Sequence, residues 1–350
     1  MAERHQPRLR LALLLAGGGR ATRRLFADDG PAAGRPLANA PAALKAEVAR
    51  LLDDEVPRVL GHAQREGWRW LVPGDAGYPS LLGHTSDPPL GLFVRGELRA
   101  GAAVAVVGSR RATAYGRQVA RTLAEKLAAA GVVVVSGMAR GIDAAAHEGA
   151  LAAGGSTWAV WGTGPGRIYP AEHRELAGAI ATHGALITEY LPGTPPRKHH
   201  FPERNRVIAG VASAVVVVEA AARSGALITA RLALDEGREV LAVPGSVLSD
   251  VSVGPNTLLK LGARPMLTPA DVLDVIGVRP EPAATDAAPS HPLLDHLPSG
   301  VSLTADELVL RSGLTVTEVH GALLELELSG IVERRPSGAF ARRSATLPGE

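Results

Sequence analysis

Three short segments in the middle of the chain place glycine, serine and arginine directly after apolar runs, a combination that suits anion binding. The segments begin at Gly108, Ser136 and Ser224, and each leads into a stretch with helical spacing. Backbone N–H groups at the start of a helix favour phosphate, and glycine lets the backbone approach a ligand closely. The residues expected to bind phosphate are Ser109, Arg110, Gly137, Arg140, Gly141, Ser224 and Gly225. Ordinary strand-to-helix turns with solvated arginines are the alternative interpretation.

The same segments do not carry the signature of a known nucleotide-binding enzyme. The first segment lacks the G-x-G-x-x-G fingerprint, and the chain has no P-loop lysine motif. Glu219, at the end of an apolar run, could be catalytic or could orient an arginine. Because the chain shows neither a nucleophile–base pair nor a metal-binding cluster of carboxylates, we expect a binding protein rather than an enzyme, with no catalytic residue and no cofactor.

The richest basic cluster spans residues 197–206 and combines four arginine or lysine side chains with two histidines and one phenylalanine. Proteins that bind single-stranded nucleic acid combine a positive groove with aromatic side chains on which bases stack. The residues expected to contact nucleic acid are Lys198, Phe201, Arg204, Asn205 and Arg206. A solvated loop with Phe201 anchored in the core is the alternative. The adjacent His199 and His200 do not have the spacing of zinc ligands, so no metal is expected.

The elements that position these segments are indicated by six valine-rich apolar runs that alternate with amphipathic stretches. Such runs are typical of strands buried on both faces of a parallel sheet. The alternation predicts a doubly wound, mostly parallel, Rossmann-like α/β domain with right-handed crossovers. The runs cover residues 104–107, 132–135, 158–161, 186–188, 215–218 and 240–243. In such a fold the loops after the strands meet at one crevice, so the segments named above should converge there.

Changes in composition divide the chain into domains. Residues 1–72, rich in alanine, leucine and arginine, have the spacing of a small helical domain. Residues 73–277 contain the sheet domain, which begins with an irregular connector over residues 73–100. Residues 278–291 are rich in proline and alanine and predict a linker. Residues 292–343 predict two helices followed by a hairpin, the outline of a winged helix.

The predicted winged helix does not have the charge of a sequence-specific DNA reader. Its second helix carries Glu318, Glu325 and Glu327, and a recognition helix in the major groove faces phosphates that would repel these carboxylates. The hydroxyls of Thr304 and Thr315 are expected to cap the two helices.

Bulk composition narrows the class of protein. The 350 residues have a formal net charge of +2, which is too small an excess to indicate nucleic-acid binding by itself. Cysteine is absent, which excludes disulfides and thiolate metal sites. No apolar run approaches the roughly 20 residues of a membrane helix. The apolar stretch 11–16 faintly resembles a secretion signal, but a buried first helix is the favoured interpretation, and we expect a cytoplasmic protein with no membrane partner.

The motifs resemble, in their order along the chain, those of the DprA/Smf family. Each motif alone is weak, but the ordered set covers about 170 residues and is specific. The matching stretches are Val107-Gly108-Ser109-Arg110, Ser136-Gly137-x-Ala139-x-Gly141-Ile142-Asp143, Tyr169-Pro170, Phe201-Pro202-x-Arg204-Asn205-Arg206, Val218-Glu219-Ala220, Ser224-Gly225 and Val243-Pro244-Gly245. The chain departs from the family pattern at Gly166, near which an aspartate is usual, and at Ala226 and Thr188, where serine is common.

The resemblance implies a fold and a function. It implies a SAM-like helical domain before residue 73 and a DprA-type winged helix after residue 290. It also implies single-stranded DNA bound in a positive pocket and protected there, self-association as a homodimer, and loading of a RecA-type recombinase during natural transformation. By the same resemblance, Leu258 and Leu259 are candidates for the self-association surface, with packing into the core as the alternative.

A nucleotide-processing enzyme is the competing interpretation. Nucleoside-monophosphate phosphoribohydrolases of the lysine-decarboxylase-like fold share this topology but carry a P-G-G-x-G-T-x-x-E motif. That motif is absent from this chain, where Glu219 and Ser224-Gly225 occupy the comparable strand end.

Overall fold

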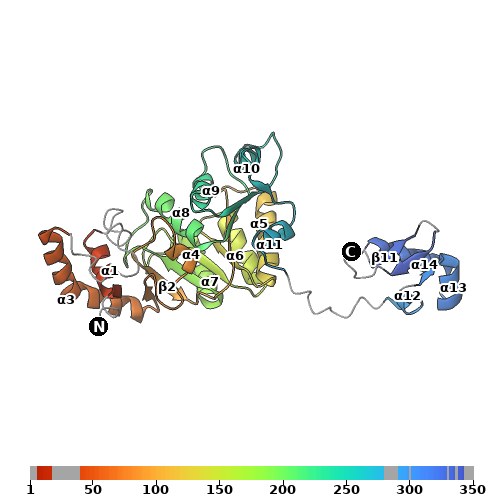
Figure 1. Ribbon diagram of the computed structural model, residues 1–350, viewed down its shortest axis with the longest axis horizontal. Coiled ribbons are helices and arrows are strands. Elements are labelled where there is room, and N and C mark those ends of the chain that lie inside the picture. Colours follow the sequence, from red (N-terminus) through yellow and green to blue (C-terminus); the bar gives the residue numbers. More distant parts are fainter. Residues whose placement is uncertain are drawn as a thin grey trace. The chain divides into compact units, whose positions relative to one another are not determined.

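A computed structural model of the protein describes residues 6–17, 40–279, 291–298, 301–328, 331–335 and 338–342. The chain divides into two compact units, Met1–Pro280 and Glu281–Glu350 (Figure 1). Residues 280–290, most of the predicted linker, lie outside the described residues, as does residue 343 at the predicted end of the winged helix. Within the described ranges, no helix is both long enough and apolar enough to cross a membrane.

The larger unit is built on a nine-stranded sheet, and the six predicted apolar runs all form strands of it. The strands from β6 to β9 are parallel, whereas β2 pairs antiparallel with β6 and β1 pairs antiparallel with β2. In spatial order the strands are β1 (Arg69–Leu71), β2 (Leu92–Gly96), β6 (Ala185–Thr188), β5 (Thr157–Val160), β4 (Val133–Ser136), β3 (Ala103–Val107), β7 (Ala214–Val217), β8 (Glu239–Ala242) and β9 (Arg264–Pro265). This mostly parallel Rossmann-like sheet confirms the predicted fold class.

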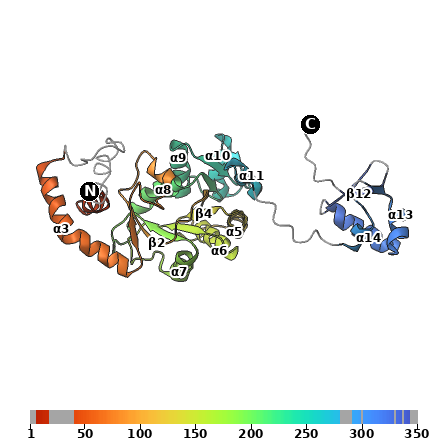
Figure 2. The same cartoon turned by 60° about the horizontal axis from the view of Figure 1, so that its bottom comes forward.

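Helices cover both faces of the sheet, which explains the continuous apolar runs. Along β3, Ala103, Ala105 and Val107 pack into the core on one face, and Val104 and Val106 pack into the core on the other. Figure 2 shows α8 and α9 on one side of the strands and α7 on the other. The helices on the first face are α4 (Ser80–Gly83), α8 (His200–Val211), α9 (Gly225–Asp235) and α10 (Val253–Lys260). Those on the second face are α5 (Ala114–Ala129), α6 (Ile142–Ala152), α7 (Arg174–His183) and α11 (Pro269–Val275).

The strand order contains one reversal of direction. From β3 the chain builds outward through β4, β5 and β6, and it then returns to the opposite side of β3 with β7 and β8. The connections after β3 and β7 therefore diverge from each other. The crevice left at such a switch point is where open α/β sheets bind ligands.

Two helices at the start of the chain pack against the edge of the sheet. They are α1 (Gln6–Leu15) and α3 (Ala42–Arg65), and α3 joins two predicted helical segments into one helix with Pro57 inside it. The indole N–H of Trp70 in β1 donates to the carbonyl oxygen of Pro7 at 2.9 Å, and Trp68 packs edge-on against Trp161. Residues 69–71 were predicted to belong to the helical domain, but they form a strand of the sheet. The domain boundary at residue 72 stays a prediction.

The smaller unit has the arrangement expected of a winged helix. Its three-stranded sheet has the order β10-β12-β11, and its core is formed by leucines together with Val319, Val332 and Phe340. Thr304 and Thr315 each accept a hydrogen bond at a helix start, from the N–H groups of Glu307 and Glu318. The elements are α12 (Pro292–Asp295), β10 (Ser302–Leu303), α13 (Ala305–Ser312), α14 (Val316–Leu328), β11 (Val332–Arg334) and β12 (Phe340–Arg342).

The helices that follow β3 and β4 pack unusually close together. Gly149 on α6 lies directly against the backbone of α5, and a Cβ atom there would overlap the carbonyl oxygen of Arg121. Since both helices begin at loops that approach the crevice, this contact fixes the spacing of those loops.

We expect Gly149→Ala to destabilise the larger unit by about 1–3 kcal/mol, because the added methyl group meets main-chain atoms that cannot rotate away. Denaturant unfolding followed by circular dichroism measures the change. Gly178→Ala on α7 is the matched control, since a Cβ at Gly178 has no heavy atom within 4 Å. That substitution should be neutral or stabilise by roughly 0.5–1 kcal/mol through helix propensity. Equal effects of the two substitutions would show that close packing of α5 and α6 is unimportant.

Candidate nucleic-acid interface

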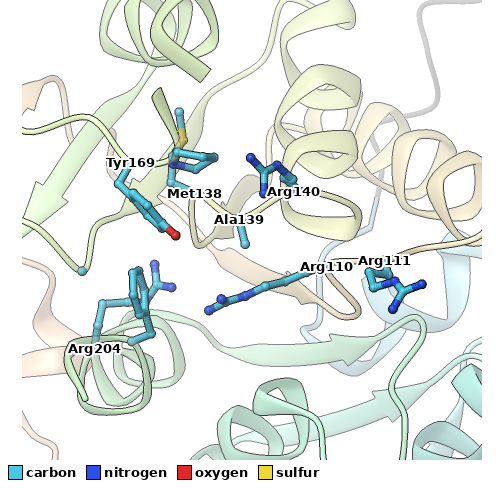
Figure 3. Close-up of a pocket in the computed structure, with 10 residues that line it drawn as sticks. Arg110, Arg111, Met138, Ala139, Arg140, Tyr169 and Arg204 are labelled. Atoms are coloured by element: carbon cyan, nitrogen blue, oxygen red, sulfur yellow. The ribbon is translucent and has the colours of Figure 1, made fainter. Parts of the chain in front are cut away.

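The carboxyl ends of β3 and β7 open onto a cavity of about 550 Å³, which we call the main crevice. The predicted site residues that line it are Ser109, Arg110, Lys198, Phe201, Arg204, Asn205, Ser224 and Gly225. A second cavity of about 130 Å³, the side cavity, shares Arg110, Ala139, Tyr169, Phe201 and Arg204 with it (Figure 3). The predicted convergence of loops from separate strands on one crevice therefore occurs.

Both cavities are electrically positive. The side chains of Arg110, Lys198 and Arg204 line the main crevice, and Asp143 is the carboxylate that opposes them. The side cavity is lined by four arginines and by no carboxylate. Within the described residues, no group of three histidine, aspartate or glutamate side chains is arranged to hold a metal ion. An anion is the ligand that this charge distribution favours.

The first loop is held in place by Glu219, which is buried at the end of β7. Its carboxylate accepts a hydrogen bond from the N–H of Thr113 at 2.9 Å, and its carbonyl oxygen accepts one from the N–H of Ser109 at 2.6 Å. Gly116 leaves room for that carboxylate, because a Cβ there would overlap it. Glu219 is thus occupied in fixing the loop. Arg110 projects from this loop into the crevice, with its guanidinium 5.1 Å from the ring centroid of Phe201.

The centre of the site is the buried guanidinium of Arg204, which is 4% exposed and lines both cavities. It donates to the carbonyl oxygen of Val160, but its Nε is buried with no hydrogen-bond partner among the described residues. Burial lowers the pKa of Arg204 to about 10, and the negative charge of Asp143 opposes this shift. Burial also raises the pKa of Asp143, which accepts a hydrogen bond from the N–H of Ala139 at 3.2 Å.

Two predicted glycines shape the site without lining it. A Cβ at Gly137 would overlap Asp143 and come within 2.7 Å of the Arg204 guanidinium, so only glycine lets these groups lie against the backbone. Gly141 has a φ of 80° and lies directly against the carbonyl oxygen of Ser109. The N–H of Ile142 donates to that same oxygen at 3.2 Å. These contacts hold the first and second loops together.

The start of α9 faces the crevice on its other side. Ser224 caps the helix by accepting a hydrogen bond from the N–H of Ala226 at 3.3 Å. Asn205, which is buried, donates from Nδ2 to the carbonyl oxygen of Gly225 at 3.2 Å. Asn205 therefore ties α8 to α9, and the positive end of the α9 dipole opens toward the cavity.

The basic cluster is divided between two environments, because residues 200–211 form a helix rather than a loop. Arg206 points away from the crevice into a separate cavity of about 630 Å³. There it donates to the carboxylate of Glu189 and to the carbonyl oxygen of Asp87 at 2.7 Å. The structure therefore does not bring Arg206 to the site. Arg140 lines the side cavity, where it forms an ion pair with Glu172.

Comparison with known proteins places this geometry in a family. The family model described as DNA recombination-mediator protein A matches residues 69–277, and that of the DprA winged helix domain matches residues 278–338. The chain belongs to the DprA family. It is 41% identical over 292 residues to Protein Smf of Escherichia coli, covering 79% of this chain and 78% of the relative. It is 39% identical over 241 residues to the DNA processing protein DprA of Bacillus subtilis, covering 68% and 81%.

Solved DprA structures share the fold. The Streptococcus pneumoniae protein aligns with a TM-score of 0.62 at 37% identity, covering 68% of this chain and 83% of that protein. The Helicobacter pylori protein, whose structure was described for its single-stranded DNA binding mode, aligns with a TM-score of 0.54 at 28% identity. This second alignment covers 60% of this chain and 97% of that protein.

Two residues of this DprA site were not assigned a binding role from the sequence. Tyr169 lines both cavities and is 44% exposed, with its ring centroid 5.5 Å from that of Phe201. The Tyr169-Pro170 pair was recognised as a motif, but nothing in its spacing indicated that it faces the loops of other strands. Asp143 matches the family motif too, and its position in a first helical turn indicated only compensation of the helix dipole.

The two residues predicted for self-association are both half-buried on α10. Leu258 packs against the core of the sheet domain. The adjacent Leu261 is 78% exposed and Leu248 is 92% exposed.

His147 supports the second loop from below. Its ring is buried and hydrogen-bonded on both sides, with Nε2 2.6 Å from the carbonyl oxygen of Gly137 and Nδ1 2.7 Å from the hydroxyl oxygen of Thr157. Burial lowers the pKa of His147 to about 4. The unfolded chain therefore binds a proton at this residue between about pH 6.5 and pH 4 that the folded chain does not bind.

We expect His147 to cost the protein up to about 3 kcal/mol of stability as the pH falls from 6.5 to 4. The His147→Gln variant keeps an amide that can form both hydrogen bonds but does not titrate. Its free energy of unfolding should fall less than that of the parent between pH 7 and pH 4.5, as measured by urea denaturation. The raised pKa of Asp143 acts in the opposite direction in both proteins, so the difference between them isolates His147. His183→Gln, at an exposed position on α7, should leave the pH dependence unchanged. Parallel pH profiles for the parent and His147→Gln would contradict this assignment.

Proposed function

We propose that the protein binds single-stranded DNA in the main crevice, shields it there, and passes it to a RecA-type recombinase during recombination or DNA uptake. The observation that carries the proposal is that the side chains of Arg110, Lys198 and Arg204 line one crevice together with the rings of Tyr169 and Phe201. Membership of the DprA family and the fold shared with a single-stranded DNA-binding relative support it. Binding and transfer of a strand require no reaction, so the protein acts without catalytic groups.

The phosphate contacts follow from the geometry. Arg110 is exposed and reaches into the crevice, and its planar guanidinium can donate two parallel hydrogen bonds to one phosphate. The guanidinium of Arg204 lines the same crevice and adds a second positive charge. The start of α9 at Ser224 and Gly225 offers a positive helix end to a neighbouring phosphate, and Lys198 lies at the rim.

Two aromatic side chains are available for stacking with the bases. Phe201 and Tyr169 both line the crevice, and stacking on such rings is worth roughly 1–3 kcal/mol per base. Paired bases in a duplex are already stacked on each other and cannot turn into a crevice of this kind. This difference favours single strands over duplexes.

Self-association belongs to the same proposal. Within residues 247–267 the exposed apolar side chains are Val247, Leu248, Val253, Leu261 and Leu267. Exposed apolar side chains of this size within one segment are typical of protein contact surfaces. We place the homodimer contact on this segment, with Leu261 and Leu248 as the contributing side chains rather than the core-packed Leu258.

Arg110→Ala should weaken binding of a single-stranded oligonucleotide by roughly 10- to 150-fold at physiological salt, since one charged phosphate contact is lost. The dependence of log affinity on log salt concentration should become shallower by about one unit. Fluorescence anisotropy titrations at two salt concentrations measure both quantities.

Arg231→Ala is the control for loss of a positive charge, because Arg231 is exposed on α9 and lines none of the three cavities. This variant should bind nearly as the parent does, and both substitutions should leave stability almost unchanged. A folded Arg110→Ala protein with parental affinity would place DNA binding elsewhere. Turnover of nucleoside monophosphates by the parent would instead favour the enzyme interpretation.

Leu261→Arg should convert the homodimer to a folded monomer, because a buried unpaired charge at a subunit contact costs several kcal/mol. Analytical ultracentrifugation at matched concentrations measures the change in mass. Leu234→Arg introduces the same side chain on α9 at a position that is 57% exposed and should leave the mass unchanged. Dimers of unchanged stability in Leu261→Arg would exclude this surface.

A further inference from the structure

One face of α14, the second of the two main helices in the smaller unit, carries apolar side chains on its outside (Figure 2). Val319, Leu323 and Leu326 point inward and are buried in the core of the unit. Val316 and Leu324, in contrast, are exposed over more than half of their surface. Residues three or four positions apart share a face of a helix. The face that we call the outer face of α14 therefore consists of Val316, Thr317, His320, Gly321 and Leu324, all of them exposed.

The glycine on the outer face is not required by the packing of the unit. Glycine lowers the stability of a helix more than any other residue except proline. A Cβ at Gly321 would have no heavy atom within 4 Å, so no neighbouring segment of the described chain needs the missing side chain. A helical glycine leaves the backbone open to close approach by another molecule. Gly321 therefore points to a partner that comes close to α14.

The surroundings of the outer face are acidic. Glu318 and Glu325 lie on α14 beside it, and Glu327 continues it by one further turn. The described residues of the smaller unit include seven aspartate or glutamate side chains and four arginines. Hydrogen bonds from the hydroxyl and the N–H of Thr315, at 2.7 and 2.8 Å, lower the pKa of Glu318. Its carboxylate is therefore negative at neutral pH.

The arginines of the hairpin contact other groups of the same unit. The guanidinium of Arg334 lies 5.7 Å from the ring centroid of Phe340, and Arg335 forms an ion pair with Glu333 at 2.8 Å. Arg342 is half-buried and donates to a main-chain carbonyl oxygen. A winged helix that binds DNA places its second helix among phosphates, which an acidic helix would repel. The ligand that suits this unit is a cationic one.

We propose that the outer face of α14 is a docking surface for a basic amphipathic helix of a partner protein. Apolar side chains of such a helix would cover Val316 and Leu324, and the open backbone at Gly321 would let the two helices approach closely. Lysine or arginine side chains on its flanks would face Glu318 and Glu325. A second copy of α14 is a poor occupant, because it would bring the same carboxylates to the contact. This inference does not depend on DNA binding in the main crevice.

The test uses the full chain and three synthetic helical peptides of equal length. The first peptide has leucines along one face and lysines on its flanks. The second has the same composition with the leucines distributed around the helix, and the third has glutamate in place of lysine. Only the first should bind saturably in fluorescence anisotropy titrations, since docking needs both the apolar face and the positive charge.

Two substitutions of equal charge locate the peptide. Leu324→Lys should weaken binding of the first peptide by about tenfold or more, because it adds a positive charge at the centre of the contact. Leu310→Lys adds the same charge to α13 at a strongly exposed position outside the outer face. It should change the affinity by less than about twofold, as expected of a charge at the rim of a contact or beyond it.

Gly321→Gln tests close approach without a change in charge. Glutamine favours a helix more than glycine does, so the midpoint of thermal unfolding should not fall. Binding of the first peptide should nevertheless weaken by about tenfold, because the new side chain keeps the partner helix away from the backbone.

The remaining outcomes would overturn the inference. These are failure of the first peptide to bind the parent, equal binding of all three peptides, or equal losses in Leu324→Lys and Leu310→Lys. Parental affinity in both Leu324→Lys and Gly321→Gln would place the peptide elsewhere. A dimer that Leu324→Lys converts to a monomer, with peptide binding unchanged, would assign the face to a second copy of the chain. Binding of oligothymidine, measured in parallel, should be the same in every variant, and its loss would instead make the outer face part of the DNA site.

Discussion

A guanidinium held in the protein interior without a full set of partners is the interaction on which the site depends. Arg204 is buried, and desolvation of such a cation costs several kcal/mol unless nearby groups compensate for it. Asp143 supplies an opposite charge and Val160 supplies a carbonyl oxygen, yet the Nε of Arg204 stays unsatisfied. The crevice that Arg204 lines therefore has a positive charge on one side, which favours an anion there.

The rest of the architecture keeps this guanidinium in place. Gly137 provides room for it beside Asp143, and His147 fixes the carbonyl group of Gly137 from beneath. Glu219 holds the neighbouring loop by hydrogen bonds to main-chain groups at two positions, so Arg110 projects from a fixed base. The reversal of strand order between β3 and β7 supplies the space into which these groups face. These residues come from different helices, strands and loops. The geometry of the site therefore depends on the whole sheet domain rather than on one sequence motif.

Much of this arrangement follows from local sequence patterns. Valine-rich runs separated by amphipathic stretches typically form a parallel sheet covered by helices on both faces. Glycines that follow those runs mark the edge of the sheet at which ligands bind. The assignment of residues to the site failed where the geometry of a helix decides which way a side chain points. Arg204 and Arg206 are two positions apart on α8, and residues at that spacing do not share a face. Composition also does not show that Asp143 meets Arg204 across the sheet edge, since such pairs depend on packing between distant segments. The short strand β1 was missed because three residues next to a long helix carry little periodic signal.

The pairing of arginines with carboxylates limits the distance over which the protein attracts charged molecules. Arg121 pairs with Glu148, Arg140 with Glu172, and Arg206 with Glu189 and Asp87. With a formal net charge of +2, the chain has a weak far field. Screening at physiological ionic strength confines the remaining field to about 8 Å. A rigid polyanion beyond this distance is therefore only weakly attracted. Binding in the crevice requires a strand that is flexible enough to enter it.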